Sequence, residues 1–138
     1  MIISTKGRYA LKIMLYLALH ADEGFVSLRK ISESEDISVK YLEAIVAMLN
    51  RAGMVESQRG KEGGYRLTKS AGEYTVGSIV KLTEGSISPV SCIECESGSC
   101  ENAGSCLTLP VWINLDRLVD NYLESITLLD LIERKVEY

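Results

Sequence analysis

The pattern that most limits the fold lies between residues 27 and 68, where two short helical segments precede a glycine-rich hairpin. Ser27 is placed to cap the first helix and Ser38 the second, because a serine hydroxyl accepts a hydrogen bond from the free N–H groups of a first turn. Residues 35–37 form the turn between them, and Gly53 ends the second helix. The sequence therefore predicts a helix, a turn and a helix.

A β-hairpin is expected directly afterwards. Residues 54–58 and 65–68 have the composition of short strands, and the connecting segment Arg59–Gly64 contains three glycines. Helices followed by such a hairpin are typical of a winged helix-turn-helix domain, although that fold also serves as a protein-interaction module. We expect a mainly α-helical protein with a small β-hairpin wing, divided into a DNA-binding domain at 1–75 and a second part at 76–138.

The remaining segments are also predicted to be helical. The apolar residues of the first 21 positions follow helical spacing, which favours an amphipathic core helix over a signal peptide. Further helices are expected at Val76–Thr83, from about Leu107 onward, and at Leu128–Val136 with Thr127 as its cap. The long helix carries apolar residues at helical spacing that suit a core or a dimer seam better than a cofactor site: Trp112, Leu115, Leu118, Val119 and Leu123.

Charge is distributed unevenly along the chain. The net charge is −4, which argues against a uniformly basic nucleic-acid binder. Residues 1–70, however, carry 11 Lys and Arg against 8 Asp and Glu, a charge of +3, whereas residues 71–138 carry 4 against 11, a charge of −7. We expect the first half to approach phosphate. No segment has the roughly 20 apolar residues that span a bilayer, so a cytoplasmic protein without membrane contact is expected.

The segment Ser38–Arg51 is the candidate reading helix, with Leu42, Ile45 and Leu49 on its inner face. Lys40 and Tyr41 can contact the DNA backbone, and Glu43 can accept a hydrogen bond from a cytosine amine. Arg59 at the wing tip suits the minor groove, whose potential attracts guanidinium groups. The alternative is that these charges form only a solvated helix face. The candidate DNA-binding residues are Ser38, Lys40, Tyr41, Glu43, Arg59, Gly60 and Lys61.

Four cysteines fall within residues 92–106, at Cys92, Cys95, Cys100 and Cys106. Closely spaced thiolates among small residues suit soft metals, as in an iron-sulfur cluster or a tetrahedral zinc site. The loop lacks the two separated C-x-x-C pairs of a zinc ribbon. If the protein is cytoplasmic, its thiols are reduced by default, so a structural disulfide is the weaker interpretation.

Four segments together resemble the Rrf2 family of bacterial regulators, which includes IscR-like and CymR-like members. They are Ser4–Ala10 (STKGRYA), Ile37–Glu43 (ISVKYLE), Arg59–Tyr65 (RGKEGGY) and Ile126–Leu128 (ITL). The resemblance covers nearly the whole chain. It implies a homodimeric winged-helix repressor or activator bound to a double-stranded DNA operator, with the long C-terminal helix as the dimerisation element. It also implies that Ser38 and Tyr41 hold the DNA backbone, Glu43 reads a base and Arg59 enters the minor groove.

The resemblance also points to a cofactor, because IscR-like members bind a two-iron two-sulfur cluster through three cysteines and one histidine. This chain departs from that pattern, with Leu109 at the histidine position and Glu94 at the position of the first cysteine. We favour an all-cysteine ligand set that uses Cys92 and Cys95 together. A cluster with another fourth ligand such as Glu94, a zinc site and a metal-free thiol loop remain as alternatives. His20, the only histidine, is interpreted as a helix-end residue.

The sequence therefore predicts a dimeric transcription regulator that senses iron-sulfur or redox status. One alternative is a CymR-like repressor without a cluster, controlled by a protein co-regulator. Another, from a different class, is a thiol or iron-sulfur redox protein. The chain contains no phosphate-binding loop, and a single histidine makes most general-base schemes poor candidates, so we do not expect an enzyme.

Overall fold

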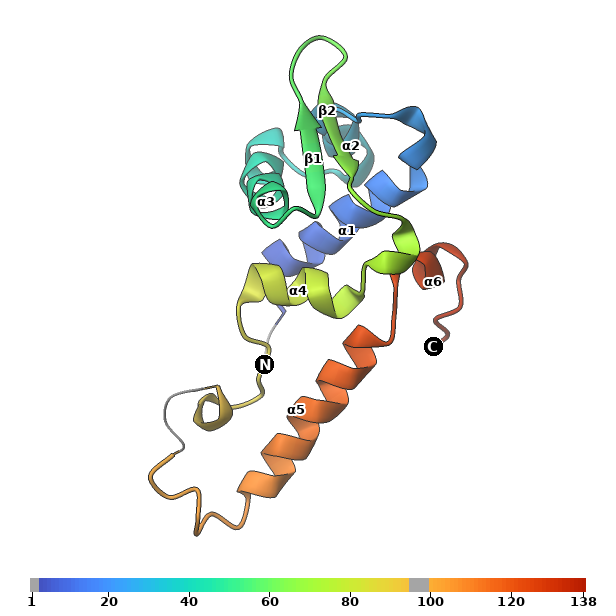
Figure 1. The fold of residues 1–138 in the computed structure, drawn as a ribbon. Helices are drawn as coiled ribbons and strands as arrows, with labels where there is room; N and C mark the ends of the chain where they lie inside the picture. The colour runs from blue at the N-terminus through green and yellow to red at the C-terminus, as the bar shows by residue number, and fades with distance from the viewer. Residues whose placement is uncertain (1–2, 95–99) are drawn as a thin grey trace.

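The computed structural model describes residues 3–94 and 100–138, which fold into a helical body with one long helix extending from it (Figure 1). In chain order the elements are α1 (Thr5–Leu19), α2 (Leu28–Glu35), α3 (Val39–Arg51), β1 (Val55–Gln58), β2 (Gly64–Leu67), α4 (Val76–Glu84), α5 (Leu109–Glu124) and α6 (Leu128–Ile132), with 3-10 turns at Ala21–Glu23, Ala71–Glu73 and Ser91–Ile93. The predicted mainly α-helical fold with a hairpin is confirmed.

The helices begin where the sequence places short polar side chains. The Ser27 hydroxyl accepts a hydrogen bond from the Lys30 N–H at 3.3 Å, and the Thr127 hydroxyl accepts one from the Asp130 N–H at 3.1 Å. Each bond satisfies an N–H group that has no partner within its own helix. The predicted capping roles of Ser27 and Thr127 are therefore confirmed.

The last helix is shorter than predicted. It ends at Ile132 instead of Val136, because Arg134 takes a left-handed backbone conformation with φ of 55°. The Lys135 N–H then donates to the Asp130 carbonyl oxygen at 2.9 Å, which closes the end of the helix. Apolar spacing did not reveal this stop, since no glycine marks it.

The hairpin is antiparallel and is attached to the segment before α2. Its register pairs Val55 with Leu67 and Gln58 with Gly64. Val26 pairs with Tyr65 through two backbone hydrogen bonds of 2.8 Å. A side chain at Gly64 would overlap the Val26 carbonyl oxygen, so this close approach requires glycine. The wing is thereby held beside the helix-turn-helix.

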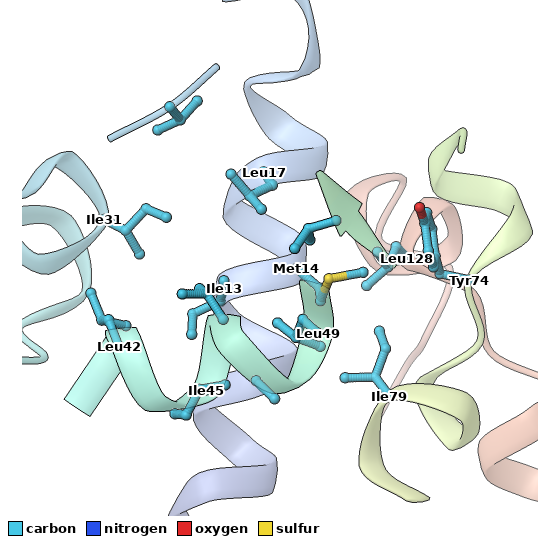
Figure 2. Packing of buried hydrophobic residues seen from close by; sticks show 14 of the residues in the cluster. Ile13, Met14, Leu17, Ile31, Leu42, Ile45, Leu49, Tyr74, Ile79 and Leu128 are labelled. Atoms are coloured by element: carbon cyan, nitrogen blue, oxygen red, sulfur yellow. The ribbon is translucent and has the colours of Figure 1, made fainter. Parts of the chain in front are cut away.

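A single cluster of buried apolar side chains unites the helices around α1, as Figure 2 shows. Its large, fully buried members come from the helices, the segment before α2 and β1: Ile13, Met14, Leu17, Val26, Ile31, Leu42, Ile45, Val46, Leu49, Val55, Ile79 and Leu128. Burying one such side chain contributes about 1.5–3 kcal/mol, so this cluster is the main stabilising feature of the body.

The long helix α5 lies largely outside this core. It packs against α4 and projects away from the body, towards the loop that contains the cysteines (Figure 1). No residue of α5 is buried. Within the part of the chain that the structure describes, no helix is long and apolar enough to cross a membrane.

Candidate nucleic-acid interface and cysteine loop

The helix α3 presents one apolar and one open face. Leu42, Ile45, Val46 and Leu49 are buried against the body, which confirms the predicted inner face. The Ser38 hydroxyl accepts a hydrogen bond from the Tyr41 N–H at 3.3 Å, so this serine caps the helix as predicted. The side chains on the other face are exposed: Lys40, Tyr41, Glu43, Ala44, Ala47 and Arg51.

The turn before α3 fixes the angle at which the helix leaves the body. Asp36 takes the left-handed conformation with φ of 53°, which short polar residues tolerate. The Ser32 hydroxyl donates to the Ile37 carbonyl oxygen at 2.6 Å, and the Ile37 side chain is buried. The turn therefore rests on the core, and α3 is positioned by rigid neighbours.

The wing carries the other candidate DNA-binding residues. Arg59, Gly60 and Lys61 lie in the exposed loop between β1 and β2, and the Gly63 N–H donates to the Gly60 carbonyl oxygen at 3.0 Å. Neither Arg59, Lys61 nor Lys40 forms an ion pair with another residue in the described ranges. These cations are thus available to a negatively charged partner.

Two residues near α3, Tyr9 and Ala44, were not among the candidate DNA-binding residues predicted from the sequence. The Tyr9 ring of α1 meets the Tyr41 ring edge to face, with centroids 5.5 Å apart and an interplanar angle of 83°. Beside Tyr41, a pocket of about 320 Å³ is lined by Ser38, Lys40, Tyr41 and Ala44. Tyr9 lies within the segment Ser4–Ala10, but helical spacing alone does not indicate which aromatic residue it contacts.

The cysteine loop precedes α5 and contains free thiols. Cys92 is exposed, whereas Cys100 and Cys106 are partly exposed. Cys92 and Cys100 share a pocket of about 330 Å³ with Leu109 and Ile113 of α5. Cys95, the remaining predicted ligand, lies outside the described residues. Two of the predicted ligands therefore face one pocket next to the start of α5.

Cys106 lies three residues before α5, and its environment favours the thiolate. Its sulfur is 3.4 Å from the Thr108 hydroxyl oxygen. This contact, together with the backbone N–H groups of Thr108 and Leu109, lowers the pKa of the Cys106 thiol. The thiolate is the form that binds metals.

The chemistry of these donors fits an iron-sulfur cluster, because cysteine thiolates are its usual ligands. Among residues 3–94 and 100–138, no three histidine, cysteine or acidic side chains are gathered closely enough to hold a metal ion. Leu109, at the family's histidine position, is one of the apolar residues that line the pocket. His20 is occupied elsewhere, since its Nδ1 lies 2.8 Å from the Tyr16 carbonyl oxygen and its ring stacks on the Tyr16 ring.

A polar cluster joins the far end of α5 to α4. Lys81 of α4 forms ion pairs with Asp120 and with Glu124, the latter at 2.8 Å. The Thr75 hydroxyl donates to Glu124 at 2.7 Å. Hydrogen bonds from Lys81 and Thr75 lower the pKa of Glu124, and bonds to Asp120 and Glu124 raise the pKa of Lys81. These hydrogen bonds and ion pairs connect the C-terminal end of α5 to α4.

An apolar stripe on α5 faces solvent. Four side chains at spacings of four, three and four residues make up the stripe, and 57%, 38%, 68% and 58% of their surfaces are exposed: Val111, Leu115, Leu118 and Tyr122. These spacings match the seam of two packed helices. Of the five residues predicted for a core or a dimer seam, Leu115 and Leu118 lie on this stripe, whereas Trp112, Val119 and Leu123 are partly buried.

Comparisons with known proteins agree with this geometry. The sequence model of the Rrf2 family, described as an iron-dependent transcriptional regulator, matches residues 3–134. The HTH-type transcriptional regulator IscR of Pectobacterium atrosepticum is 40% identical over 133 residues, covering 96% of this chain and 80% of IscR. The structure of CymR, the global cysteine regulator of B. subtilis, is 40% identical with a TM-score of 0.80, covering 97% and 98% of the two chains. T. potens IscR is 34% identical with a TM-score of 0.79, covering 99% and 89%.

Proposed function

The chain belongs to the Rrf2 family of transcriptional regulators, and from this premise we propose that it is a homodimer whose cysteine loop controls how α3 and the wing bind an operator. Residues 1–75 bind double-stranded DNA in this proposal, and residues 76–138 carry dimerisation and sensing. The observation that carries it is the position of α5. Its first turn lines the pocket of Cys92 and Cys100, and its last turn is bonded to Lys81 beside the DNA-binding body.

DNA binding uses the open face of α3 and the wing. Ser38 and Tyr41, at the start of α3, hold the DNA backbone, and Lys40 and Lys61 add phosphate contacts. Glu43 accepts a hydrogen bond from a cytosine amine in the major groove. Arg59 enters the minor groove, with Gly60 allowing the wing tip to approach the backbone closely. The support is the exposure of these side chains and the absence of ion pairs to Lys40, Arg59 and Lys61 within the described ranges.

A second copy of this chain covers the apolar stripe of α5. Exposing the four apolar side chains of this helix face to water is unfavourable. Their spacing fits packing against a second helix that carries the same stripe. A homodimer also places two copies of α3 on one duplex, as expected for a regulator that reads a two-fold symmetric operator.

The proposed sensor is a cluster held by Cys92, Cys95, Cys100 and Cys106. An iron-sulfur cluster bound there supplies a group whose charge and presence depend on redox state and iron supply. The chain's own contribution would be to hold Cys92 and Cys100 in the pocket at the start of α5, with Cys106 three residues before the helix, so that ligation would couple these thiols to its first turn. Lys81, Asp120 and Glu124 then transmit a change in the position of α5 to α4.

A cluster-free repressor controlled by a protein co-regulator is the second candidate. Leu109 favours it, because an apolar side chain stands where IscR-like members place a histidine ligand. The high similarity to CymR, a cysteine regulator, is compatible with either candidate.

Metal analysis of anaerobically purified protein distinguishes the two. We expect iron and acid-labile sulfide in equal amounts, together with visible sulfur-to-iron absorption. In Cys100→Ala we expect the iron, the sulfide and the absorption to be lost. A control, Ser105→Ala, changes an exposed residue of the same loop and should retain the absorption. Colourless, iron-free protein that still represses would support the cluster-free candidate, and zinc in place of iron would indicate a structural metal site.

A further inference from the structure

A pocket lies along the start of α3, and three of its lining residues, Ser38, Lys40 and Tyr41, are also proposed to contact the DNA backbone through their polar groups. It has a volume of about 320 Å³ and is lined by Ser38, Lys40, Tyr41 and Ala44. The Tyr41 ring and the Ala44 methyl group provide its apolar surface. Ala44 lies next to Glu43 on the exposed face of the helix, so the pocket opens where a base pair would meet α3.

The wall of this pocket is fixed before any ligand arrives. The Tyr41 ring packs edge to face on Tyr9 of the neighbouring helix, and its backbone N–H is bound by the Ser38 hydroxyl. Only 37% of Tyr41 is exposed. Because the Tyr41 ring is held in one position, a group that contacts it causes no reorganisation of this side chain.

The small side chain of Ala44 also keeps the pocket open. Residues 40, 43, 44 and 47 share one helix face, since they are separated by three or four positions. Lys40 and Glu43 have long side chains, but Ala44 leaves room beside Tyr41 for a group that approaches from the major groove. A group that contacts Tyr41 and Ala44 there must present an apolar surface.

Only one apolar group projects from the base edges into the major groove of ordinary DNA, the 5-methyl group of thymine. We propose that the pocket of Tyr41 and Ala44 receives a thymine methyl group and so selects a T·A pair next to the base pair read by Glu43. Tyr9 is the positioning residue, because it holds the Tyr41 ring. This inference rests on the proposed DNA-binding function.

The test removes the methyl group and nothing else. A duplex is first enriched from a random library with the full-length protein, and each thymine of the enriched site is then replaced by deoxyuridine. We expect one replacement per half-site to weaken binding about fourfold, as loss of one buried methyl group predicts. In Ala44→Gly the same replacement should have little effect, whereas Ala47→Gly, an exposed alanine outside the pocket, should retain the fourfold loss.

Two results would refute the thymine-methyl contact without refuting DNA binding. One is an enriched duplex whose affinity does not change when any thymine is replaced by deoxyuridine, and the other is an equal loss of affinity in wild type and Ala44→Gly. Failure to enrich any duplex would instead refute DNA reading itself, and this inference with it. Measuring Tyr9→Leu separates a positioning role from a structural one. It should reduce the discrimination between thymine and deoxyuridine while preserving binding to the deoxyuridine duplex.

Discussion

The hydroxyl group of Tyr74 joins the base of the wing to the segment that leads into α4. Its ring is buried, with 3% of the residue exposed. The hydroxyl donates to the Met54 carbonyl oxygen at 2.9 Å and accepts hydrogen bonds from the backbone N–H groups of Lys69 at 2.9 Å and Thr68 at 3.1 Å. Tyr74→Phe removes this one oxygen and leaves the buried ring in place.

The magnitude follows from the groups that lose their partner. A buried polar group without a partner costs about 1–3 kcal/mol. Thr68 and Lys69 are exposed, so water can reach part of the vacated site, and the Thr68 N–H also lies 3.4 Å from the Met54 carbonyl oxygen. We therefore expect Tyr74→Phe to lower the free energy of unfolding by about 2 kcal/mol. For a chain of this size this corresponds to a fall in Tm of roughly 6–10 °C.

Urea unfolding followed by circular dichroism measures this loss. All variants must be compared at one protein concentration, because the stability of a dimer depends on it. Tyr65→Phe is the matched control, since the partly buried Tyr65 packs against the same core and its hydroxyl bonds to no other residue in the described ranges. Equal stability of Tyr74→Phe and Tyr65→Phe would refute the bridging role of the Tyr74 hydroxyl.

Three further variants test the helix contacts and the DNA-binding surface. Glu124→Gln should cost about 1 kcal/mol or less at neutral pH, because the Lys81 ion pair is about one-third exposed. The pKa of Glu124 is lowered in the fold, so its contribution is present above the ordinary glutamate pKa and is lost as the pH falls through the lowered value. Urea unfolding at several pH values should show that the free energies of unfolding of wild type and Glu124→Gln converge in acid. A difference that stays constant with pH would contradict the ion pair. Leu118→Glu should convert a dimer into monomers in sedimentation equilibrium, with Asn121→Glu unchanged as the control. If Leu118→Glu stays dimeric, the stripe is not the seam. Arg59→Ala should weaken DNA binding and reduce the slope of log affinity against log salt by about one, and an unchanged slope would contradict a phosphate or minor-groove role.

Local signals in the sequence predict much of this fold. Serine and threonine caps and apolar spacing correctly place the start of α2, α3 and α6, and the glycines of the wing loop predict the hairpin. These signals work because each depends on residues close together in the sequence, three or four positions apart for the caps and the helix faces and within one short loop for the hairpin. They fail at the end of α6, where Arg134 adopts a left-handed conformation that its residue type does not favour.

Contacts between distant segments could not be predicted in the same way. Lys81 and Glu124 are separated by 43 positions, and in the sequence both resemble ordinary surface charges. The Tyr74 hydroxyl bonds to the Met54 carbonyl oxygen, 20 positions earlier in the chain, and no local pattern predicts this contact either. At the candidate site, the inner face of α3 was predictable from periodicity, but the contact between Tyr9 and Tyr41 depends on how two helices pack.

If the cysteine loop controls DNA binding by α3 and the wing, removing a metal group from the loop must change how the protein binds its operator. The most direct measurement is the affinity for one enriched duplex, at fixed salt, of anaerobically purified protein before and after its iron is removed by chelation. A ligand shifts such an equilibrium only if it favours one arrangement over another, so we predict different affinities or different base preferences for the two forms. Identical affinity and identical base preference in both forms would show that the cysteine loop does not control DNA binding.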